Sequence, residues 1–212
     1  MTYAVKETYY TLQGEGAQVG RAAVFCRFTG CNLWSGLEKD RTTAACRFCD
    51  TDFRGTDGPG GGRFSAAREL AEHVRAAWDV EAHDGRPYVV FTGGEPLLQL
   101  DAAVIAACHD AGLEVAIETN GTLPVPPGVD WVCVSPKPRS ELVVRTGDEL
   151  KLVYPQAEFG PELFAELKFK HFFLQPMDAP DGGANTARAI AYCRAHPRWR
   201  LSLQTHKLVG IP

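Results

Sequence analysis

Short runs of apolar, β-branched and aromatic residues recur along the chain and predict strands. They fall at residues 23–28, 88–92, 113–119, 130–135, 149–153, 171–175 and 200–204. Apolar residues at helical spacing predict helices at 65–78, 100–112 and 184–196, with a weaker one at 161–167. Ser65 is the expected N-cap of the first helix, and Gly112 the expected C-cap of the second. Strands alternating with helices indicate an α/β fold with a mainly parallel sheet.

Most of these strands end abruptly in polar residues. The polar clusters are 92–95, 118–120, 135–137, 175–178 and 204–206. In parallel α/β barrels the reactive site gathers at the carboxyl ends of the strands, so the clusters predict one shared site. With 212 residues the chain is shorter than the roughly 250 of a complete eightfold barrel. We therefore expect one domain, 1–212, folded as a partial, incomplete (βα) barrel.

Composition and charge limit the kinds of partner that we expect for this protein. Hydrophobic residues make up 45% and charged residues 23%, and the formal net charge is −4, which argues against a surface that coats nucleic acid. No apolar run approaches the roughly 18 residues that span a bilayer, and the start shows no basic segment followed by an apolar one. We expect a cytoplasmic protein without membrane or nucleic-acid partners.

The chain has seven cysteines, an odd number that argues against a disulfide framework and favours metal or catalytic use of any cluster. Cys31, Cys46 and Cys49 share one loop, 31–52. The others lie singly in apolar segments, where we expect them to be small buried hydrophobes: Cys26, Cys108, Cys133 and Cys193.

The three loop cysteines leave two metal chemistries open. A structural zinc site normally has four ligands, so a zinc-binding module without catalysis would need a remote ligand such as His206. Three thiolates on a four-iron cluster would instead leave one iron open for a ligand. The spacing, together with the motifs that follow, favours the cluster.

Two further features suggest ligand contacts. In "FTGGEP" (91–96) the glycines allow close approach of a ligand and Glu95 could accept hydrogen bonds from an ammonium, although a plain turn is the alternative. Arg27 interrupts a strand, where an unpaired guanidinium would be costly. A substrate carboxylate would match its planar fork, and an internal ion pair is the alternative.

Taken together, these motifs resemble the radical S-adenosylmethionine (SAM) superfamily, in which three cysteines hold a [4Fe-4S] cluster and a Gly-Gly-Glu-Pro segment grips the methionine amino group. The superfamily pattern CxxxCxxC is interrupted here by fourteen residues between Cys31 and Cys46. Within the superfamily, the chain resembles the 7-carboxy-7-deazaguanine synthase family, which includes forms with an enlarged cluster loop. The segments that carry this resemblance are "YTLQGEG" (10–16), "FCRFTGCNLWSG" (25–36), "CRFCDTDF" (46–53), "TGGEP", "ETNGT" (118–122), "SPK" (135–137) and "QTHK" (204–207).

This resemblance implies a radical lyase that converts 6-carboxy-5,6,7,8-tetrahydropterin into 7-carboxy-7-deazaguanine with loss of ammonia, on the route to queuosine. SAM on the open iron would give a 5′-deoxyadenosyl radical that takes a hydrogen from C6 of the pterin and later recovers it. The implied cofactors are a [4Fe-4S] cluster, SAM and Mg²⁺. The implied partners are a flavodoxin- or ferredoxin-like electron donor and a second copy in a homodimer. Another radical enzyme, such as an activase that installs a glycyl radical on a protein, is an alternative, but the small size and the "QGEG" start favour a small substrate.

The resemblance also implies residue roles. Cys31, Cys46 and Cys49 would hold the cluster, and the Thr51 hydroxyl would ligate Mg²⁺ unless it only closes a turn. The SAM-contacting residues would be Phe48, Asp50, Gly94, Glu95, Ser135, Pro136, Lys137, Gln175, Pro176, Met177 and Asp178. The substrate-contacting residues would be Leu12, Gln13, Gly14, Glu15, Arg27, Thr92, Glu118, His206 and Pro212. The backbone carboxylate of Pro212 is expected to accept hydrogen bonds from the amino-pyrimidine edge of the pterin.

Overall fold

The structure, a computed structural model, describes residues 2–78, 85–157, 159–179 and 182–212. Its strands are β1 (Tyr3–Leu12), β2 (Ala22–Phe28), β3 (Gly62–Phe64), β4 (Tyr88–Gly93), β5 (Glu114–Thr119), β6 (Trp131–Val134), β7 (Thr146–Tyr154), β8 (Lys168–Pro176) and β9 (Trp199–Leu201). Its α-helices are α1 (Ala67–Ala77), α2 (Ala102–Asp110), α3 (Gly182–Ala195) and α4 (Thr205–Val209). Short 3₁₀ helices are η1 (Gly16–Gln18), η2 (Glu38–Thr43), η3 (Pro96–Leu98) and η4 (Pro161–Phe164).

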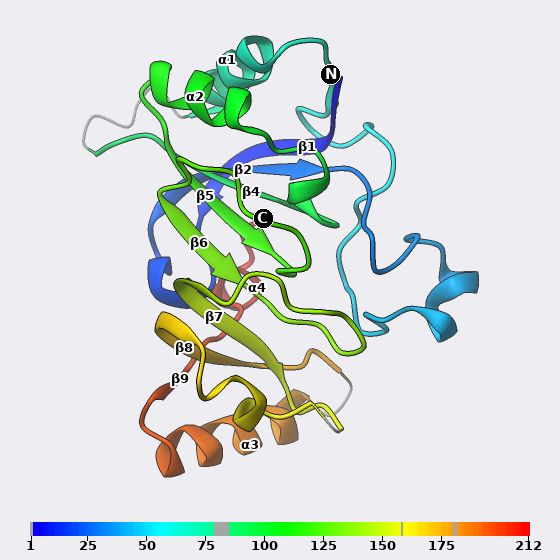
Figure 1. Ribbon diagram of the computed structural model, residues 1–212, viewed down its shortest axis with the longest axis vertical. Helices are drawn as coiled ribbons and strands as arrows, with labels where there is room; N and C mark the ends of the chain where they lie inside the picture. The colour runs from blue at the N-terminus through cyan, green and yellow to red at the C-terminus, as the bar shows by residue number, and fades with distance from the viewer. Residues whose placement is uncertain (1, 79–84, 158, 180–181) are drawn as a thin grey trace.

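The strands form a single sheet in the order β3-β1-β2-β4-β5-β6-β7-β8-β9 (Figure 1). Neighbours from β2 to β9 are parallel, whereas β1 runs antiparallel to both β2 and β3. Because β3 and β9 are edges and do not pair with each other, the sheet is an incomplete barrel. The predicted fold class is confirmed, but β1 and β3 were not predicted.

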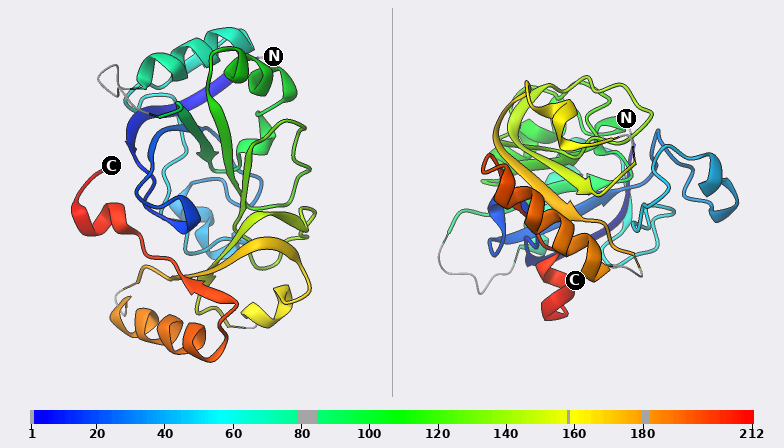
Figure 2. Two further views of the ribbon diagram at one scale, coloured as in Figure 1. Left: turned by 90° about the vertical axis from the view of Figure 1, so that its left-hand side faces the viewer. Right: turned by 90° about the horizontal axis from the view of Figure 1, so that it is seen from below.

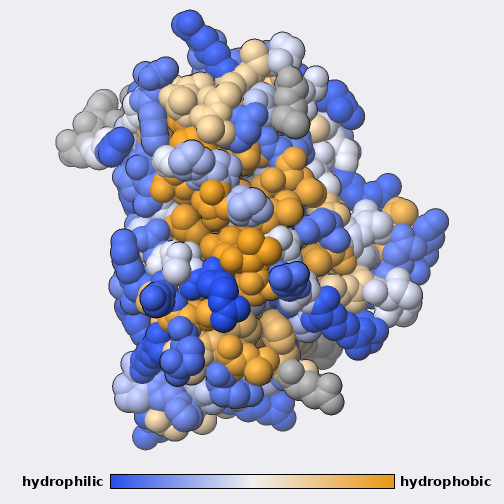
Figure 3. All heavy atoms as spheres, viewed as in Figure 1, coloured by the Kyte–Doolittle hydropathy of each residue, from blue (hydrophilic) through white to orange (hydrophobic). Residues whose placement is uncertain are grey.

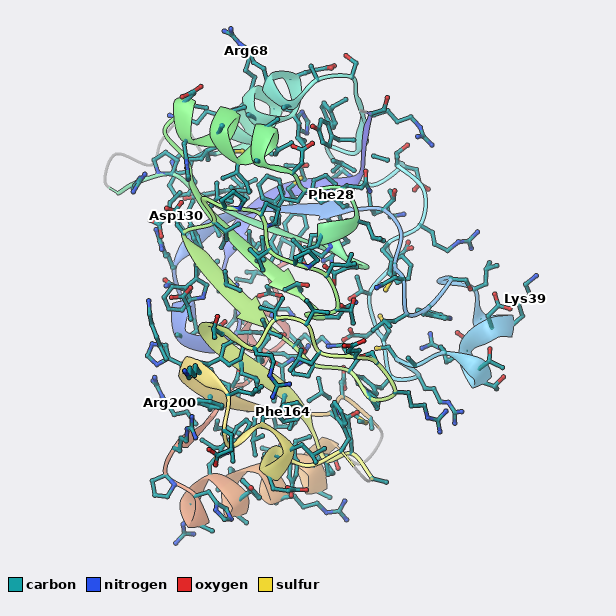
Figure 4. All side chains as sticks on the ribbon, viewed as in Figure 1. Phe28, Lys39, Arg68, Asp130, Phe164 and Arg200 are labelled. Atoms are coloured by element: carbon teal, nitrogen blue, oxygen red, sulfur yellow. The ribbon has the colours of Figure 1, made fainter. Side chains whose placement is uncertain are left out.

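Two hydrophobic cores hold the sheet. The first lies between β1, β2, β4, β5 and the helices α1 and α2, and includes the stacked rings of Phe28 and Phe91, 5.5 Å apart. The second lies between β6 to β9, η4 and α3, and includes Phe172 and Trp199, whose rings meet edge to face at 5.2 Å. Figure 1 shows α1 and α2 at one end of the sheet and α3 at the other, and Figure 4 places Phe28 and Phe164 in the separate halves.

The helix boundaries partly match the sequence. Asp101 caps α2, since Oδ1 accepts from the Ala103 and Val104 amides at 3.0 Å. The C-cap is Ala111, one residue before the predicted Gly112, which follows it in the left-handed region at φ +79°. The predicted cap Ser65 is wrong: Ala66 is the N-cap of α1, because both Ser65 groups donate to the Glu69 carboxylate instead.

The other helix predictions fare differently. The region predicted as a helix at 161–167 contains only the short turn η4, and the third predicted helix is confirmed as α3.

No helix in the described ranges is long and apolar enough to cross a bilayer. Figure 3 shows apolar side chains gathered on the central part of one face, between the helices of the two halves.

Candidate active site

A cavity of about 510 Å³ opens beside the carboxyl ends of the parallel strands, a size typical of small-molecule sites. Almost all of the predicted site residues line it, so the structure brings the polar clusters together as expected. The lining residues among them are Leu12, Gln13, Gly14, Glu15, Arg27, Cys31, Cys46, Phe48, Cys49, Asp50, Thr51, Thr92, Gly94, Glu118, Ser135, Lys137, Gln175, Pro176, Met177, Asp178, His206 and Pro212. Glu95 and Pro136 are outside the lining.

The three loop cysteines share one wall of this cavity. Cys46 is buried, and Cys31 and Cys49 are partly exposed. A small core of Trp34, Ala44 and Phe53 packs against the two partly exposed cysteines. A hydrogen bond from the Cys46 thiol lowers the pKa of Cys49, and the same bond raises the pKa of Cys46, so Cys49 ionises first.

The fourteen-residue segment between Cys31 and Cys46, called the insertion below, is tied to this wall by Arg41. The guanidinium lies 4.2 Å from the ring centre of Trp34, and Nη1 donates to the carbonyls of Arg47 (2.9 Å) and Cys49 (3.0 Å). Figure 4 shows Lys39, on η2, at the outer end of the insertion, far from the sheet. Arg41 therefore braces the CxxC turn, while Leu33 and Trp34 of the same segment line the cavity.

The donor set fits an iron–sulfur cluster better than one zinc ion. Over the described residues, no group of three or more His, Cys, Asp or Glu side chains is arranged to hold a metal ion, and this covers the three cysteines with His206. Three thiolates on one wall match a four-iron cluster whose fourth iron stays open for a ligand, whereas a structural zinc ion normally takes a fourth protein ligand.

Gly94 and Glu95, which follow β4, both contact neighbouring segments at the carboxyl ends of the strands. A Cβ atom on Gly94 would lie 2.6 Å from Cβ of Cys31 and would also meet the Gly30 carbonyl, so this position needs glycine. Glu95 is fully buried, and its carboxylate accepts from the Leu97 amide (3.0 Å), Thr119 Oγ1 (2.7 Å) and the Asn120 amide (2.8 Å). Burial raises the pKa of Glu95 despite these bonds. Its contact with an ammonium stays a prediction, which this inward position does not favour.

Two lysines line the cavity close to the cysteine loop. Lys137 donates to Oγ (2.6 Å) and the carbonyl (2.8 Å) of Ser135. Lys207 on α4 bridges Asp50 of the cysteine loop (2.9 Å) and Asp178 after β8 (2.7 Å). These contacts join three segments that are far apart in sequence around the cavity mouth.

The floor of the cavity is a buried charge network around Lys151 on β7. Its ammonium lies 2.5 Å from Glu15 and 3.3 Å from Glu118. Burial alone would lower the pKa of Lys151, but the carboxylates of Glu118 and Glu15 raise it well above its ordinary value. Burial opposes ionisation of Glu15, yet Lys151 keeps the pKa of this carboxyl below its usual range.

Arg27 has the internal ion pair that was the alternative to a substrate contact. Nε donates to Glu7 Oε1 at 2.8 Å and Nη2 to the Tyr9 hydroxyl at 3.4 Å. Because the side chain also lines the cavity, the pair orients the guanidinium there, and the predicted carboxylate contact stays a prediction.

The cavity wall beside Thr51 is acidic. Thr51 lines the cavity between Asp50 and Asp52, and Lys6 of β1 pairs with Asp52 (3.0 Å) and Asp57 (2.8 Å). Hydroxyl and carboxylate oxygens suit Mg²⁺, so the donor types fit this ion, completed by substrate and water.

The last residues, from Thr205 to Pro212, close one side of the cavity. Thr205 of α4 donates through its amide (3.0 Å) and hydroxyl (2.8 Å) to the Gly14 carbonyl, and a Cβ on Gly14 would meet the His206 ring. The Pro212 carbonyl accepts from Thr11 Oγ1 at 2.8 Å. Figure 2 shows α4 beside the segment that follows β1.

Sequence reasoning missed several charged lining residues. They are Lys6, Glu7, Asp52, Lys151 and Lys207. The one with a visible signal is Lys151, a lysine in the middle of the apolar run 149–153. Such a residue needs a buried partner, as Arg27 did.

The comparisons with known proteins agree with this site. Residues 40–133, which include Cys46 and Cys49, match the Radical SAM superfamily. A 7-carboxy-7-deazaguanine synthase of Bordetella pertussis is 65% identical over the full length of both chains. This chain belongs to the 7-carboxy-7-deazaguanine synthase family. Members of the family from Caulobacter vibrioides and Bacteroides thetaiotaomicron are 60% and 40% identical, again over both full lengths.

The fold of the family is also seen in a solved structure. The crystal structure of QueE from Escherichia coli superposes with a TM-score of 0.67 at 29% identity, covering 96% of this chain and 94% of that one. The chain is therefore a radical SAM enzyme of this family, with the incomplete barrel described above.

Proposed function

We propose that this chain converts 6-carboxy-5,6,7,8-tetrahydropterin into 7-carboxy-7-deazaguanine with loss of ammonia, using a [4Fe-4S] cluster, SAM and Mg²⁺. The observation that carries the proposal is the meeting of three cysteines and the polar strand ends in one cavity, in a chain of this family. We further propose that it works in the cytoplasm as a homodimer and receives its electron from a flavodoxin- or ferredoxin-like protein.

Cys31, Cys46 and Cys49 would hold the cluster, and the wall formed by Ser135, Lys137 and the segment 175–178 would hold SAM. When bound and reduced, the cluster and SAM supply the radical chemistry that removes a hydrogen atom from the substrate. The chain itself would orient both ligands in this one cavity, and its buried floor would limit the access of water to them.

The substrate side is shaped for an anionic, amino-bearing ring. Arg27 would present a cation for the carboxylate, and the Thr51 hydroxyl would ligate a Mg²⁺ ion that is completed by substrate oxygens and water. The floor presents the carboxylates of Glu15 and Glu118, which accept N–H groups such as those of an amino-pyrimidine. His206 and Pro212, held by the contacts of α4 and Thr11, would close this edge.

The proposal is tested by anaerobic turnover. The reconstituted protein is incubated with a reductant, SAM, Mg²⁺ and the carboxytetrahydropterin, and the product mass is measured. A product with the mass of 7-carboxy-7-deazaguanine, with SAM not consumed stoichiometrically, is expected. A brown protein that cleaves SAM yet leaves the pterin unchanged would exclude this substrate.

A further inference from the structure

The floor of the cavity holds more negative than positive charge. Glu118 on β5 is in register with Cys133 on β6, which is in register with Glu149 on β7. Lys151 lies two residues beyond Glu149, so both side chains are on the same face of the sheet. With Glu15 added, three carboxylates surround one ammonium, and the whole Lys151 residue is only 4% exposed. The burial of this lysine requires an explanation, because an ammonium is costly to bury unless it is paired.

We propose that Lys151 is a positioning residue that fixes the carboxylates of Glu15 and Glu118 as acceptors for the N–H groups of the substrate ring. The inference rests on the proposed function. It assigns a role to Lys151, which is not expected to contact SAM, the cluster or Mg²⁺.

Each of the two carboxylates is held by Lys151 from one side and by a glutamine from another. Oε2 of Glu15 meets Lys151, and its Oε1 accepts from Gln175 Nε2 at 3.0 Å. Oε1 of Glu118 accepts hydrogen bonds from both Lys151 Nζ and Gln13 Nε2, the latter at 3.0 Å. Oε2 of Glu118 takes part in neither bond. Two carboxylates anchored in this way have little freedom to rotate, which is the preorganisation that recognition requires.

The third carboxylate does not compete for this role. Glu149 Oε2 accepts from the Ala17 amide at 2.7 Å, and the carboxylate packs against Gly16 in the turn after the cavity edge. Glu149 is absent from the cavity lining, whereas Glu15, Glu118 and Lys151 are in it. Lys151 is therefore shared chiefly between the two carboxylates that can meet a ligand.

The arrangement favours a ligand edge with N–H donors over one with carbonyl oxygens. The 2-amino-4-oxo ring of a pterin presents an amino group beside a ring N–H, and both can donate to carboxylate oxygens. A 2-oxo analogue replaces the amino group with an oxygen that would face these carboxylates. Buried acceptors left without donors reject such analogues strongly.

The test compares Lys151→Met with a matched control, Lys170→Met. Lys170 also pairs with a carboxylate on the sheet, Asp148 at 2.7 Å, but its side chain is 71% exposed and lies outside the cavity. The reconstituted proteins are assayed anaerobically for iron and sulfide content, for SAM affinity, and for affinity toward the carboxytetrahydropterin with SAM present. We expect Lys151→Met to weaken pterin binding roughly 30-fold or more while iron content and SAM affinity stay near native. The control should match the native enzyme throughout.

A double variant separates positioning from direct contact. If Lys151 acts through Glu15, then Lys151→Met combined with Glu15→Gln loses much less pterin affinity than the product of the two single losses. Independent, multiplicative losses would show that the ammonium contacts the substrate itself and would overturn the positioning role. Native pterin affinity in Lys151→Met would overturn the proposal outright.

One further variant and the native enzyme are included so that each outcome can be interpreted. Lys151→Gln, which keeps a donor without the charge, replaces the Met variant if the latter does not fold, and is judged by the same criteria. The native enzyme is assayed in parallel: if it does not bind or turn over the pterin, the proposed function fails, whereas a native enzyme that works beside an unaffected Lys151 variant refutes only this inference.

Discussion

Gly94, which follows β4, packs against Cys31, the first cysteine of the loop that would hold the cluster. The space between them is too small for a methyl group, since an added Cβ would lie 2.6 Å from Cβ of Cys31. The Glu95 amide also donates to the Gly30 carbonyl at 3.0 Å, which fixes the two segments together. The "TGGEP" motif thus acts on the position of a cysteine as well as on any ligand.

Replacing Gly94 with alanine should therefore displace Cys31. We expect Gly94→Ala to lower the iron and sulfide bound per chain after reconstitution. Gly183→Ala is the control, because its added Cβ meets no atom of the described residues within 4 Å and alanine is favoured in the helix α3. Native iron content in Gly94→Ala would show that the loop relaxes without loss of the cysteine geometry.

The loop cysteines should differ from the remaining ones in iron binding. Cys31→Ala, Cys46→Ala and Cys49→Ala are each expected to abolish most cluster binding, because a cluster with two thiolates is poorly held. Cys193→Ala, at a partly buried site on α3 that is outside the cavity, should keep the native iron content. Iron and sulfide assays with the visible absorption spectrum decide, and a brown Cys31→Ala protein would contradict the ligand assignment.

Arg27→Lys should weaken pterin binding more than SAM binding. Lysine can keep a charge near Glu7 but loses the planar fork that matches a carboxylate. Arg21→Lys serves as the control: Arg21 pairs with Glu114 at 2.7 Å and stacks on Tyr88 at 3.8 Å, away from the cavity. Calorimetric titration of both ligands measures the effect. Equal losses for the two ligands would mean that Arg27 only supports the fold.

Asp101→Ala should destabilise the protein by about 1 kcal/mol, because the α2 amides of Ala103 and Val104 lose their cap. Asp101→Asn retains an acceptor oxygen and should cost much less. Urea unfolding of the three proteins compares their free energies of unfolding. An alanine variant as stable as the asparagine variant would show that the cap contributes little here.

The sequence predicted those features that depend on local pattern. The parallel strands follow from apolar runs such as 88–92, and their polar ends predicted which residues would share a cavity. β1 was missed because Lys6 and Glu7 interrupt its apolar pattern. Their partners, Asp57 and Arg27, lie at distances along the chain that no pattern reveals.

The same limit applies inside the site. The role of Glu95 was drawn from its motif, yet its carboxylate accepts hydrogen bonds from Thr119, the last residue of β5, and from Asn120, which follows it. Lys151 lies in a predicted strand, but its need for a charged partner was not predicted. Both cases depend on which side chains the sheet brings together, and register is set by long-range pairing that the sequence alone leaves open.

The cavity is lined by strands that pack on two different hydrophobic cores. Arg27 and Glu118 come from strands packed on the first hydrophobic core, whereas Lys151 and Gln175 come from strands packed on the second. A ligand seated in the cavity touches both groups, so it behaves as a removable cross-link between two halves of the sheet. Occupancy by SAM and substrate would then raise the melting temperature and sharpen the transition, because neither half could unfold without releasing its share of the bound molecules.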